Sequence, residues 1–328
     1  MGGMRETLER FLAGGSEPSD TAEVDRQLQS MQRCAARIVS IQSPDYPAKL
    51  RSVPTAPGFL FVRGDMAIAH RPAVAIVGTR KPTGAGMALA TRLARSLAML
   101  GITVVSGLAR GIDTAAHRGA LDVDGGTVAV VGTGIDVVYP PENDALMQRV
   151  VERGCVLSEQ ACGTQALAHV FPKRNRIISG LCDAVVVVEG GVRSGALITA
   201  RWALEQGREV GAVPGFPGDF RSAGPNHLLR DGAFLVEDAD DVIANLPPLA
   251  ASAVARLAGS APAARADVPV FDADTARVFD AVAKTATVDE VARAAEIDVE
   301  RAQGILARLE IDGHVMRDPM DRFTRVGR

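Results

Sequence analysis

The sequence predicts an α/β protein built on a doubly wound, mostly parallel sheet. Four short runs, at 73–77, 102–106, 127–131 and 184–188, consist of small and β-branched apolar residues with almost no polar residue among them. Strands of that composition are buried on both faces, as in a parallel sheet covered by helices. Helical patterns alternate with these runs, and only 4% of the residues are aromatic, which is typical of an Ala/Val/Leu/Ile core.

The elements divide along the chain in a consistent order. Residues 1–42 form a short helical region, with apolar residues at helical spacing over 4–12 and 21–36 and a breaker at 14–18. This region is too short for a large core of its own, so we expect it to pack on the sheet domain. The sheet domain then occupies 43–247.

Two further runs, at 211–214 and 233–236, are expected to add edge or late strands to the sheet. Residues 248–267 are rich in Ala, Pro and Ser and have little to bury. They are interpreted as a linker between two domains.

The last segment, 268–328, has the pattern of a winged-helix domain, three short helices followed by a β-ribbon with its turn at 318–321. The predicted helices cover 274–283, 287–294 and 299–309, and the ribbon pairs 313–317 with 322–326. The third helix is the one that would read bases, and the face that it offers for this carries no excess of positive charge. DNA contact is therefore weaker as an interpretation than protein contact or self-association.

Charge and cysteine content limit the function classes. The chain has 36 Lys and Arg against 39 Asp and Glu, a formal net charge of -3, so a nucleic-acid site would have to be a local patch. The four cysteines form no CxxC pair and no zinc-ligand spacing, which favours a reduced, cytoplasmic chain with thiols as small core residues. No signal peptide and no uncharged run of membrane-spanning length is evident.

The turns after the buried strands carry the candidate site residues. The first turn contains Gly78, Thr79, Arg80 and Lys81 and leads into a helix whose N-terminal amides are expected to be open to an anion. The alternative is an ordinary strand–helix turn with surface cations. The turn has neither Walker A nor GxGxxG spacing, so nucleotide hydrolysis and a standard dinucleotide site are not supported.

The second turn contains Ser106 and Gly107, with Asp113 expected to cap the next helix. Asp113 and His117 lie four residues apart on one helical face. They form either an acid/base pair or a structural hydrogen bond, and the second interpretation is favoured. The third turn contains Tyr139, either a base-stacking ring or a packed loop anchor, and it leads to Asn143, which is expected to open the next helix.

The fourth turn is the most basic, and it begins with Phe171, which the pattern alone favours as a core residue over a stacking ring. Arg174 is expected to point inward towards Glu159 or Asp183, while the neighbouring cations stay available. The full set is Phe171, Lys173, Arg174, Asn175 and Arg176.

The fifth turn, with Ser194 and Gly195, is another helix entry able to hold a phosphate. Five such turns at one edge of a sheet favour a polyanion over one small ligand, with guanidiniums on phosphates and a ring stacked on a base. No metal-ligand cluster and no nucleophile–base set is apparent, so no catalytic residue, metal or cofactor is predicted.

These same residues resemble the DNA-processing protein A (DprA, also Smf) family over about 43–247. The resemblance rests on several motifs that occur in order along the chain: Gly78-Thr79-Arg80, 106–117, 139–143, Ser158-Glu159, 171–180, Glu189, 194–201 and 213–215. Residues 45–50 and 61–64 are similar to the family's lead-in, and the end of the chain resembles its winged-helix tail. The first forty residues differ, since the family often carries a larger helical domain there.

The resemblance implies an extended Rossmann-like fold that binds single-stranded DNA, dimerises and is not an enzyme. It also implies protection of incoming DNA and loading of the RecA recombinase past single-strand-binding protein during natural transformation. By position, Arg80 would contact phosphate, the Ser106-Gly107 turn would line the groove, and Phe171 would stack on a base, which reverses the interpretation from the pattern alone. Lys173, Arg174 and Arg176 would supply charge around the ring.

Two other function classes remain as alternatives. Related folds cleave nucleotide ribosides with a Gly-rich loop and a nearby Glu, and residues 189–195 partly resemble that loop but lack its proline. A nucleotide-sensing scaffold that uses the winged helix as a regulator is the third interpretation. The salt dependence of binding distinguishes them, because only a polyanion displaces many counterions.

Overall fold

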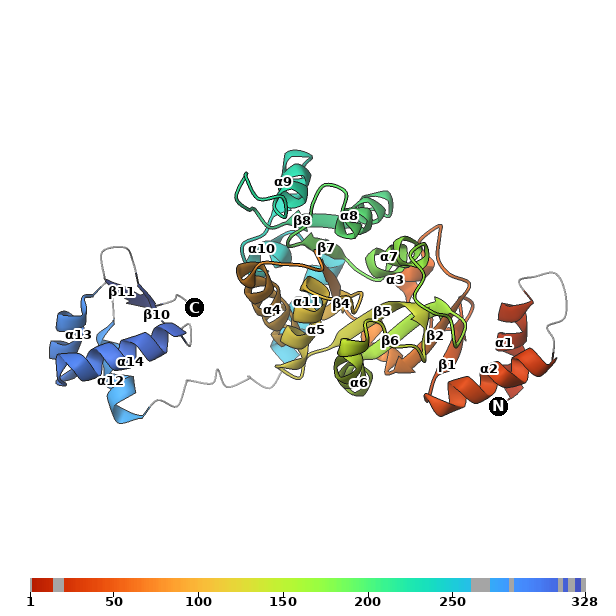
Figure 1. Cartoon of the computed structure of the whole chain (residues 1–328), viewed down its shortest axis with the longest axis horizontal. Helices are drawn as coiled ribbons and strands as arrows, with labels where there is room; N and C mark the ends of the chain where they lie inside the picture. The colour runs from red at the N-terminus through yellow and green to blue at the C-terminus, as the bar shows by residue number, and fades with distance from the viewer. Residues whose placement is uncertain are drawn as a thin grey trace. The chain divides into compact units, whose positions relative to one another are not determined.

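The structure is a computed structural model that describes residues 2–13, 21–260, 272–282, 286–311, 315–317 and 322–325. The chain divides into two compact units, Met1–Ser260 and Ala261–Arg328 (Figure 1). Each unit has its own hydrophobic core and is described by itself.

The first unit is built on a nine-stranded sheet with the strand order β1-β2-β6-β5-β4-β3-β7-β8-β9. From β6 to β9 neighbouring strands are parallel, whereas β1 and β2 pair antiparallel at one side. This confirms the mostly parallel sheet. The strands are β1 (Arg37–Ser40), β2 (Phe59–Gly64), β3 (Ala73–Val77), β4 (Thr103–Ser106), β5 (Thr127–Gly134), β6 (Cys155–Gln160), β7 (Ala184–Val187), β8 (Glu209–Ala212) and β9 (Phe234–Leu235).

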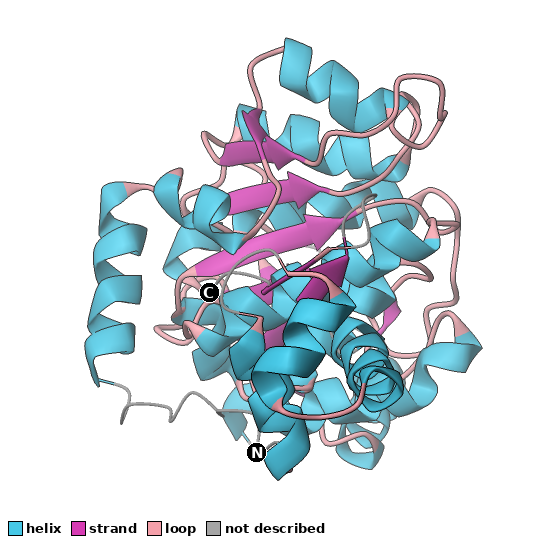
Figure 2. Ribbon diagram, turned by 90° about the vertical axis from the view of Figure 1, so that its left-hand side faces the viewer, coloured by secondary structure: helices cyan, strands magenta, loops and turns pink. Residues whose placement is uncertain are grey.

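Helices cover both faces of the sheet (Figure 2). One face is packed by α3 (Ala48–Arg51), α7 (Val170–Gly180), α8 (Gly195–Glu205) and α9 (Ala223–Arg230). The other face is packed by α1 (Gly2–Leu12), α2 (Thr21–Arg33), α4 (Gly84–Met99), α5 (Ile112–Leu121), α6 (Asp144–Arg153), α10 (Ala239–Ala244) and α11 (Pro248–Ser260).

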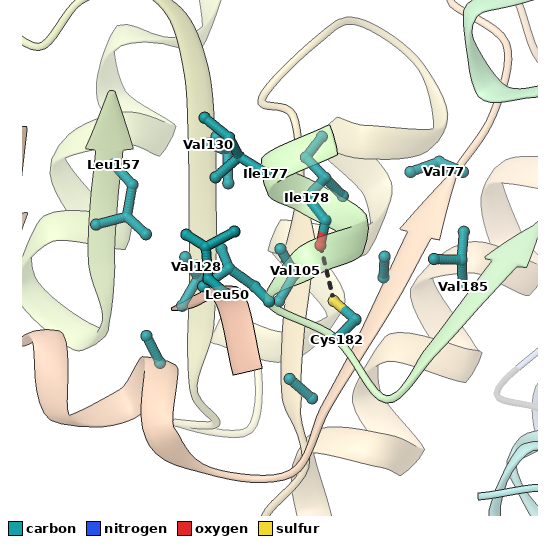
Figure 3. Close-up of a cluster of buried hydrophobic side chains, with 14 of the residues drawn as sticks. Leu50, Val77, Val105, Val128, Val130, Leu157, Ile177, Ile178, Cys182 and Val185 are labelled. Atoms are coloured by element: carbon teal, nitrogen blue, oxygen red, sulfur yellow. Dashed lines mark hydrogen bonds between the residues drawn. The ribbon is translucent and has the colours of Figure 1, made fainter. Parts of the chain in front are cut away.

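The continuous apolar strands explain this double covering. In β3, Val77 and its alternate neighbours face the α7 side, while Val74 and Ile76 face α4 and α5. Figure 3 shows the first of these layers, where Ile177 and Ile178 of α7 lie among valines of the sheet. That packing fixes α7 against the sheet and so fixes the position of its N-terminus.

The N-terminal region is not helical throughout. The predicted helices appear as α1 and α2, but residues 37–40 form β1 and pair with β2, so the sheet begins inside the predicted 1–42 segment. Hydrophobic residues of α1 and α2 pack with Phe61 of β2 and with α6. Packing of this region on the sheet unit therefore agrees with the expectation.

The interpretation of 248–267 as a linker differs from the structure over its first part. Residues 248–260 form α11, whose Ala250 and Val254 are buried against the α4 face of the sheet. Alanine is the strongest helix former, so an Ala-rich stretch with few polar residues can bury a helical face as readily as it can form a linker. Residues 261–267 lie outside the described part of the chain.

The second unit has three helices, α12 (Ala273–Ala281), α13 (Val288–Ala295) and α14 (Val299–Ile311), followed by strands β10 (Val315–Arg317) and β11 (Phe323–Arg325). The two strands pair antiparallel, with Met316 opposite Thr324. Helices and ribbon share one hydrophobic core. This confirms the winged-helix pattern, while the predicted turn at 318–321 lies outside the described residues.

The topology predicts where a ligand binds. The chain passes from β3 through α4 to β4 on one side of β3, and it later returns through α7 to β7 on the other side. The loop after β3 leads to α4 and the loop after β7 leads to α8, on the opposite face of the sheet, so these two loops diverge and leave a crevice at the carboxyl ends of the strands.

Candidate functional site

A cavity of about 750 Å³ lies at this point of divergence. We call it the switch-point pocket. It is lined by the β3–α4 loop, by α7 and the start of α8, by Ala166 and Ala168 of the β6–α7 loop, and by Ala109, Asp113, Tyr139 and Phe220. A second, smaller hollow adjoins it and is lined in part by Arg80, Gly107, Arg110 and Phe171.

The pocket is cationic although the chain is acidic overall. Three cationic side chains, Arg80, Lys81 and Arg174, line it against one carboxylate, that of Asp113. Arg80 and Lys81 are exposed, and neither has an ion-pair partner among the described residues. The local excess of positive charge is the kind of patch that a chain of net charge -3 requires to hold a polyanion.

Phe171 stands in the wall of the pocket. Its ring packs closely on β5, where a Cβ at Gly132 would lie 3.1 Å from the ring, and its centroid is 5.6 Å from that of Tyr139. The guanidinium carbons of Arg80 and Arg174 lie 5.5 and 5.9 Å from the ring centroid. The ring is half-buried and not part of the hydrophobic core, so the core interpretation from the pattern alone is wrong.

Arg174 points inward, as expected, but with other partners than those predicted. Its guanidinium donates to the carbonyl oxygens of Gly107 (2.8 Å) and Val130, and to Oδ1 of Asn175 (3.2 Å). Burial lowers the pKa of Arg174 to about 10, and the nearby Asp113 carboxylate opposes that shift. Arg174 is only 7% exposed. Its guanidinium therefore serves mainly to link β5, the β4–α5 loop and α7 through these hydrogen bonds.

Asp113 has a different role from the helix cap that was expected. Its Oδ2 accepts hydrogen bonds from the backbone amides of Gly107 (3.1 Å) and Ala109 (3.3 Å), which precede the helix. Burial raises the pKa of Asp113, and the charge of Arg174 opposes this. A Cβ at Gly107 would lie 2.6 Å from Nη2 of Arg174 and 2.7 Å from Oδ2 of Asp113, so only glycine permits this close arrangement.

The predicted hydrogen bond between Asp113 and His117 is wrong. His117 Nδ1 lies 2.7 Å from the hydroxyl of Thr127 on β5, deep in the sheet unit. Burial, with a smaller contribution from Arg174, lowers the pKa of His117 to about 3. The imidazole is therefore neutral and structural.

The remaining cations of the fourth turn point in different directions. Lys173 is exposed but does not line the switch-point pocket. Arg176 is not available as predicted, because its Nη2 lies 2.6 Å from Oε1 of Glu159. Asp183, the other expected partner of Arg174, instead pairs with Lys49 at 2.5 Å.

The amides at the N-terminus of α4 are not open to an anion. Glu189, from the end of β7, accepts hydrogen bonds from the amide (2.9 Å) and hydroxyl (2.5 Å) of Thr83, which in turn caps α4 through the amide of Gly86 (2.9 Å). A Cβ at Gly86 would lie 2.4 Å from Oε1 of Glu189. The place where a nucleotide phosphate would bind in a dinucleotide-type fold is thus filled by the chain's own carboxylate.

The N-terminus of α8 is arranged differently. Its N-cap residue, Ser194, makes no capping hydrogen bond, and the Ser194 hydroxyl is buried without a partner among the described residues. Asn175 ties this turn to α7 by donating to the carbonyl of Gly195 (3.1 Å). An oxyanion in the pocket would meet both the hydroxyl and the α8 amides.

Of the twelve residues predicted for the site, eight line the pocket: Gly78, Thr79, Arg80, Phe171, Arg174, Asn175, Ser194 and Gly195. Gly107 lines only the smaller hollow. Ser106 is fully buried and donates to the carbonyl of Ile76 (2.7 Å), so its side chain does not line the groove as predicted. Lys173 and Arg176 stand outside the pocket.

Sequence reasoning missed Phe220, which lines the pocket and is 70% exposed. The signal was available in 214–220, where two phenylalanines stand among glycine and proline after the last long strand. Such a loop has no regular face to bury a ring, so its rings are expected at the surface.

The described residues contain no helix long and apolar enough to cross a membrane. Over the same ranges, no group of His, Cys, Asp or Glu is placed to hold a metal ion.

Two family models match the chain. The one described as DNA recombination-mediator protein A matches residues 37–247, and the one described as DprA winged helix domain matches 258–319. Protein Smf of Escherichia coli is 42% identical over 210 residues, which cover 64% of this chain and 56% of that protein.

Two solved structures are similar in fold. DNA processing protein A of Streptococcus pneumoniae has a TM-score of 0.65 at 40% identity, covering 70% of this chain and 79% of that one. DNA processing protein A of Helicobacter pylori, described for its single-stranded DNA binding mode, has a TM-score of 0.57 at 28% identity, covering 62% and 93%.

Proposed function

Because this chain belongs to the DNA recombination-mediator protein A family, we propose that it binds single-stranded DNA in the switch-point pocket. The observation that carries the proposal is the combination of Arg80 and Lys81, exposed and without ion-pair partners among the described residues, with the half-buried ring of Phe171. Cations that meet phosphates next to a ring that meets a base are the common solution for single strands bound without sequence preference.

Each group has a distinct role in this proposal. Arg80 neutralises a phosphate, and Phe171 stacks on a base while the guanidiniums beside it add cation–π attraction. Ser194 and the α8 amides hold a second phosphate. Arg174 and Asn175 act as positioning residues, because their hydrogen bonds fix the N-terminus of α7 against β5 and α8.

The riboside-cleaving alternative is less well supported. It requires a carboxylate available to a sugar, and the candidate, Glu189, is bound to the amide and hydroxyl of Thr83. We therefore propose a binding protein without an enzymatic activity of its own.

Binding is tested by fluorescence anisotropy of a labelled oligothymidylate at several salt concentrations. Arg80→Ala should weaken binding and flatten the slope of log affinity against log salt by about one unit, since one phosphate contact is lost. Phe171→Ala should cost about 1–3 kcal/mol of binding free energy. The matched control is Arg95→Ala, an exposed arginine of α4 about 16 Å from the start of that helix.

Failure of the wild type to bind, or equal losses for Arg80→Ala and Arg95→Ala, would contradict the pocket as the site. Tight binding of a mononucleotide with a shallow salt dependence would favour the nucleotide-site alternative instead.

We further propose that the DNA complex protects incoming DNA and loads the RecA recombinase during natural transformation, as a homodimer and in the presence of single-strand-binding protein. The test is RecA filament formation on a single strand already coated with single-strand-binding protein. Wild type should shorten the lag, whereas Arg80→Ala should not. Mass measurement by light scattering tests the dimer.

A further inference from the structure

Two phenylalanine rings stand in solvent on the loop between β8 and α9. Phe216 is 79% exposed and Phe220 is 70% exposed. Exposed rings cost hydration free energy, so a pair of them on one loop indicates a surface that is covered in function.

The loop is ordered by its own hydrogen bonds. Asn226 holds Gly215 from both sides, accepting from its amide at 3.1 Å and donating to its carbonyl at 2.9 Å. The carbonyl of Arg221 accepts from the amide of Gly190 at 2.6 Å, which ties the loop to the end of β7. The rings are therefore displayed by a fixed turn, as preorganised binding requires.

Phe220 lines the switch-point pocket, as Phe171 does. The guanidinium carbon of Arg221 lies 5.2 Å from the centroid of the Phe220 ring. Asp219 fixes that guanidinium through three contacts, Nε to Oδ1 at 3.0 Å, Nε to Oδ2 at 3.2 Å and Nη2 to Oδ2 at 2.8 Å. Because Asp219 balances the charge, this end of the pocket offers stacking more than phosphate attraction.

The two phenylalanines cannot serve the same base. Phe171 packs on β5, whereas the loop that carries Phe220 is held through the carbonyl of Arg221 at Gly190, just after β7, three strands further along the sheet. At the usual spacing of hydrogen-bonded strands, three steps amount to about 14 Å. A ligand that touches both rings must be extended and must present more than one flat apolar face.

We propose that Phe220, with Phe216 beyond it, forms a second base-stacking platform for the single strand as it leaves the switch-point pocket. This inference rests on the proposed function and extends it from one stacked base to a path along the carboxyl ends of the strands. The occupant is single-stranded nucleic acid because the platform is continuous with a cationic pocket, and only a polymer with repeated flat bases fits both ends.

The test compares labelled oligothymidylates of about two and about twenty nucleotides on wild type and variants, because only the longer strand can reach both rings. Phe220→Ala should weaken binding of the long strand about five-fold or more and leave the short strand close to wild type. Phe220→Trp should retain the long-strand affinity, since tryptophan also stacks. The Phe216→Ala/Phe220→Ala double variant should lose more than the single variant.

The matched control is Met99→Ala. Met99 is 67% exposed and apolar, and it ends α4, whose N-terminus is at the pocket. A fluorescent adenine analogue placed at successive positions of the long strand should be quenched at two separate positions in wild type and at one in Phe220→Ala.

The outcomes separate the two proposals. If the long strand binds Phe220→Ala as tightly as wild type while Phe171→Ala loses affinity, the second platform is wrong and the pocket stands. If wild type binds neither strand, both proposals fall. If Phe220→Ala changes the molecular mass in solution without DNA, the rings cover a second copy of the chain and the platform is overturned.

Discussion

Arg174 offers the sharpest test of how the pocket is built, because the family resemblance and the structure assign it different roles. By position in the motif it supplies charge to DNA. In the structure it is 7% exposed and donates to Gly107, Val130 and Asn175. Arg174→Met, which keeps much of the length and volume but removes the charge and donors, distinguishes the two.

The expected loss of stability arises from the groups that the variant leaves unpaired. The carbonyls of Gly107 and Val130 lose a charged donor, and the buried Asp113 carboxylate loses the positive charge that lowers its pKa. Removing one charge from a buried set of this kind costs about 3–5 kcal/mol. We expect the lower end, about 3 kcal/mol, because Asp113 keeps its two amide donors.

The assay is urea unfolding followed by the fluorescence of the single tryptophan, Trp202 of α8, which reports on the sheet unit. With a denaturant slope of about 3 kcal/mol per molar, the midpoint should fall by about 1 M. Adding Asp113→Asn to Arg174→Met should recover part of this loss, since the uncompensated carboxylate is removed. Arg80→Ala, at an exposed position, should change stability by less than about 0.5 kcal/mol.

The reasoning is refuted if Arg174→Met unfolds at the wild-type midpoint yet no longer binds a single strand. That result would make Arg174 a direct phosphate ligand in the bound state.

Three further predictions concern groups around the same unit. The pKa of Cys34 is lowered to about 7, first by a hydrogen bond with the thiol of Cys162, so Ellman's reagent at pH 7.5 should modify Cys34 well before the three buried cysteines. The pKa of His117 is lowered to about 3, below its unfolded value of about 6.5, so wild type should lose about 2 kcal/mol between pH 7 and pH 5 that His117→Asn does not lose. Gly107→Ala should cost about 1–3 kcal/mol and weaken DNA binding, because its methyl group would displace Arg174.

The sequence predicted the sheet well because its strands are buried on both faces. Runs such as Ala73–Val77 and Ala184–Val187 have no polar alternation, and no other structure accommodates several of them in a chain with helical segments between. The first two strands were not predicted, since Arg37–Ser40 is four residues long and Phe59–Gly64 ends in charge and glycine. Their place in the sheet comes from tertiary pairing, of β2 with β6 and of β1 with β2.

The sequence predicted which residues lie at the site better than it predicted the contacts that those residues make. The residues after each parallel strand meet at the carboxyl ends for topological reasons, so a list of such residues contains most of the pocket. What the pattern could not give is which partners neutralise which charges. Arg176 and Arg174 stand two residues apart in α7, yet one pairs with Glu159 and the other turns into the sheet unit.

The arrangement of carboxylates supports the proposal that this site binds a single strand and not a nucleotide. In a dinucleotide site, one helix N-terminus concentrates binding energy on one pyrophosphate. Here Glu189 fills that position at α4, and Asp113 takes the amides of the next loop. The cations without ion-pair partners among the described residues and the exposed rings are left spread along the loops instead of gathered at one point. A ligand gains from such a surface only by extending across it, and each stacked base and neutralised phosphate then adds a separate contribution.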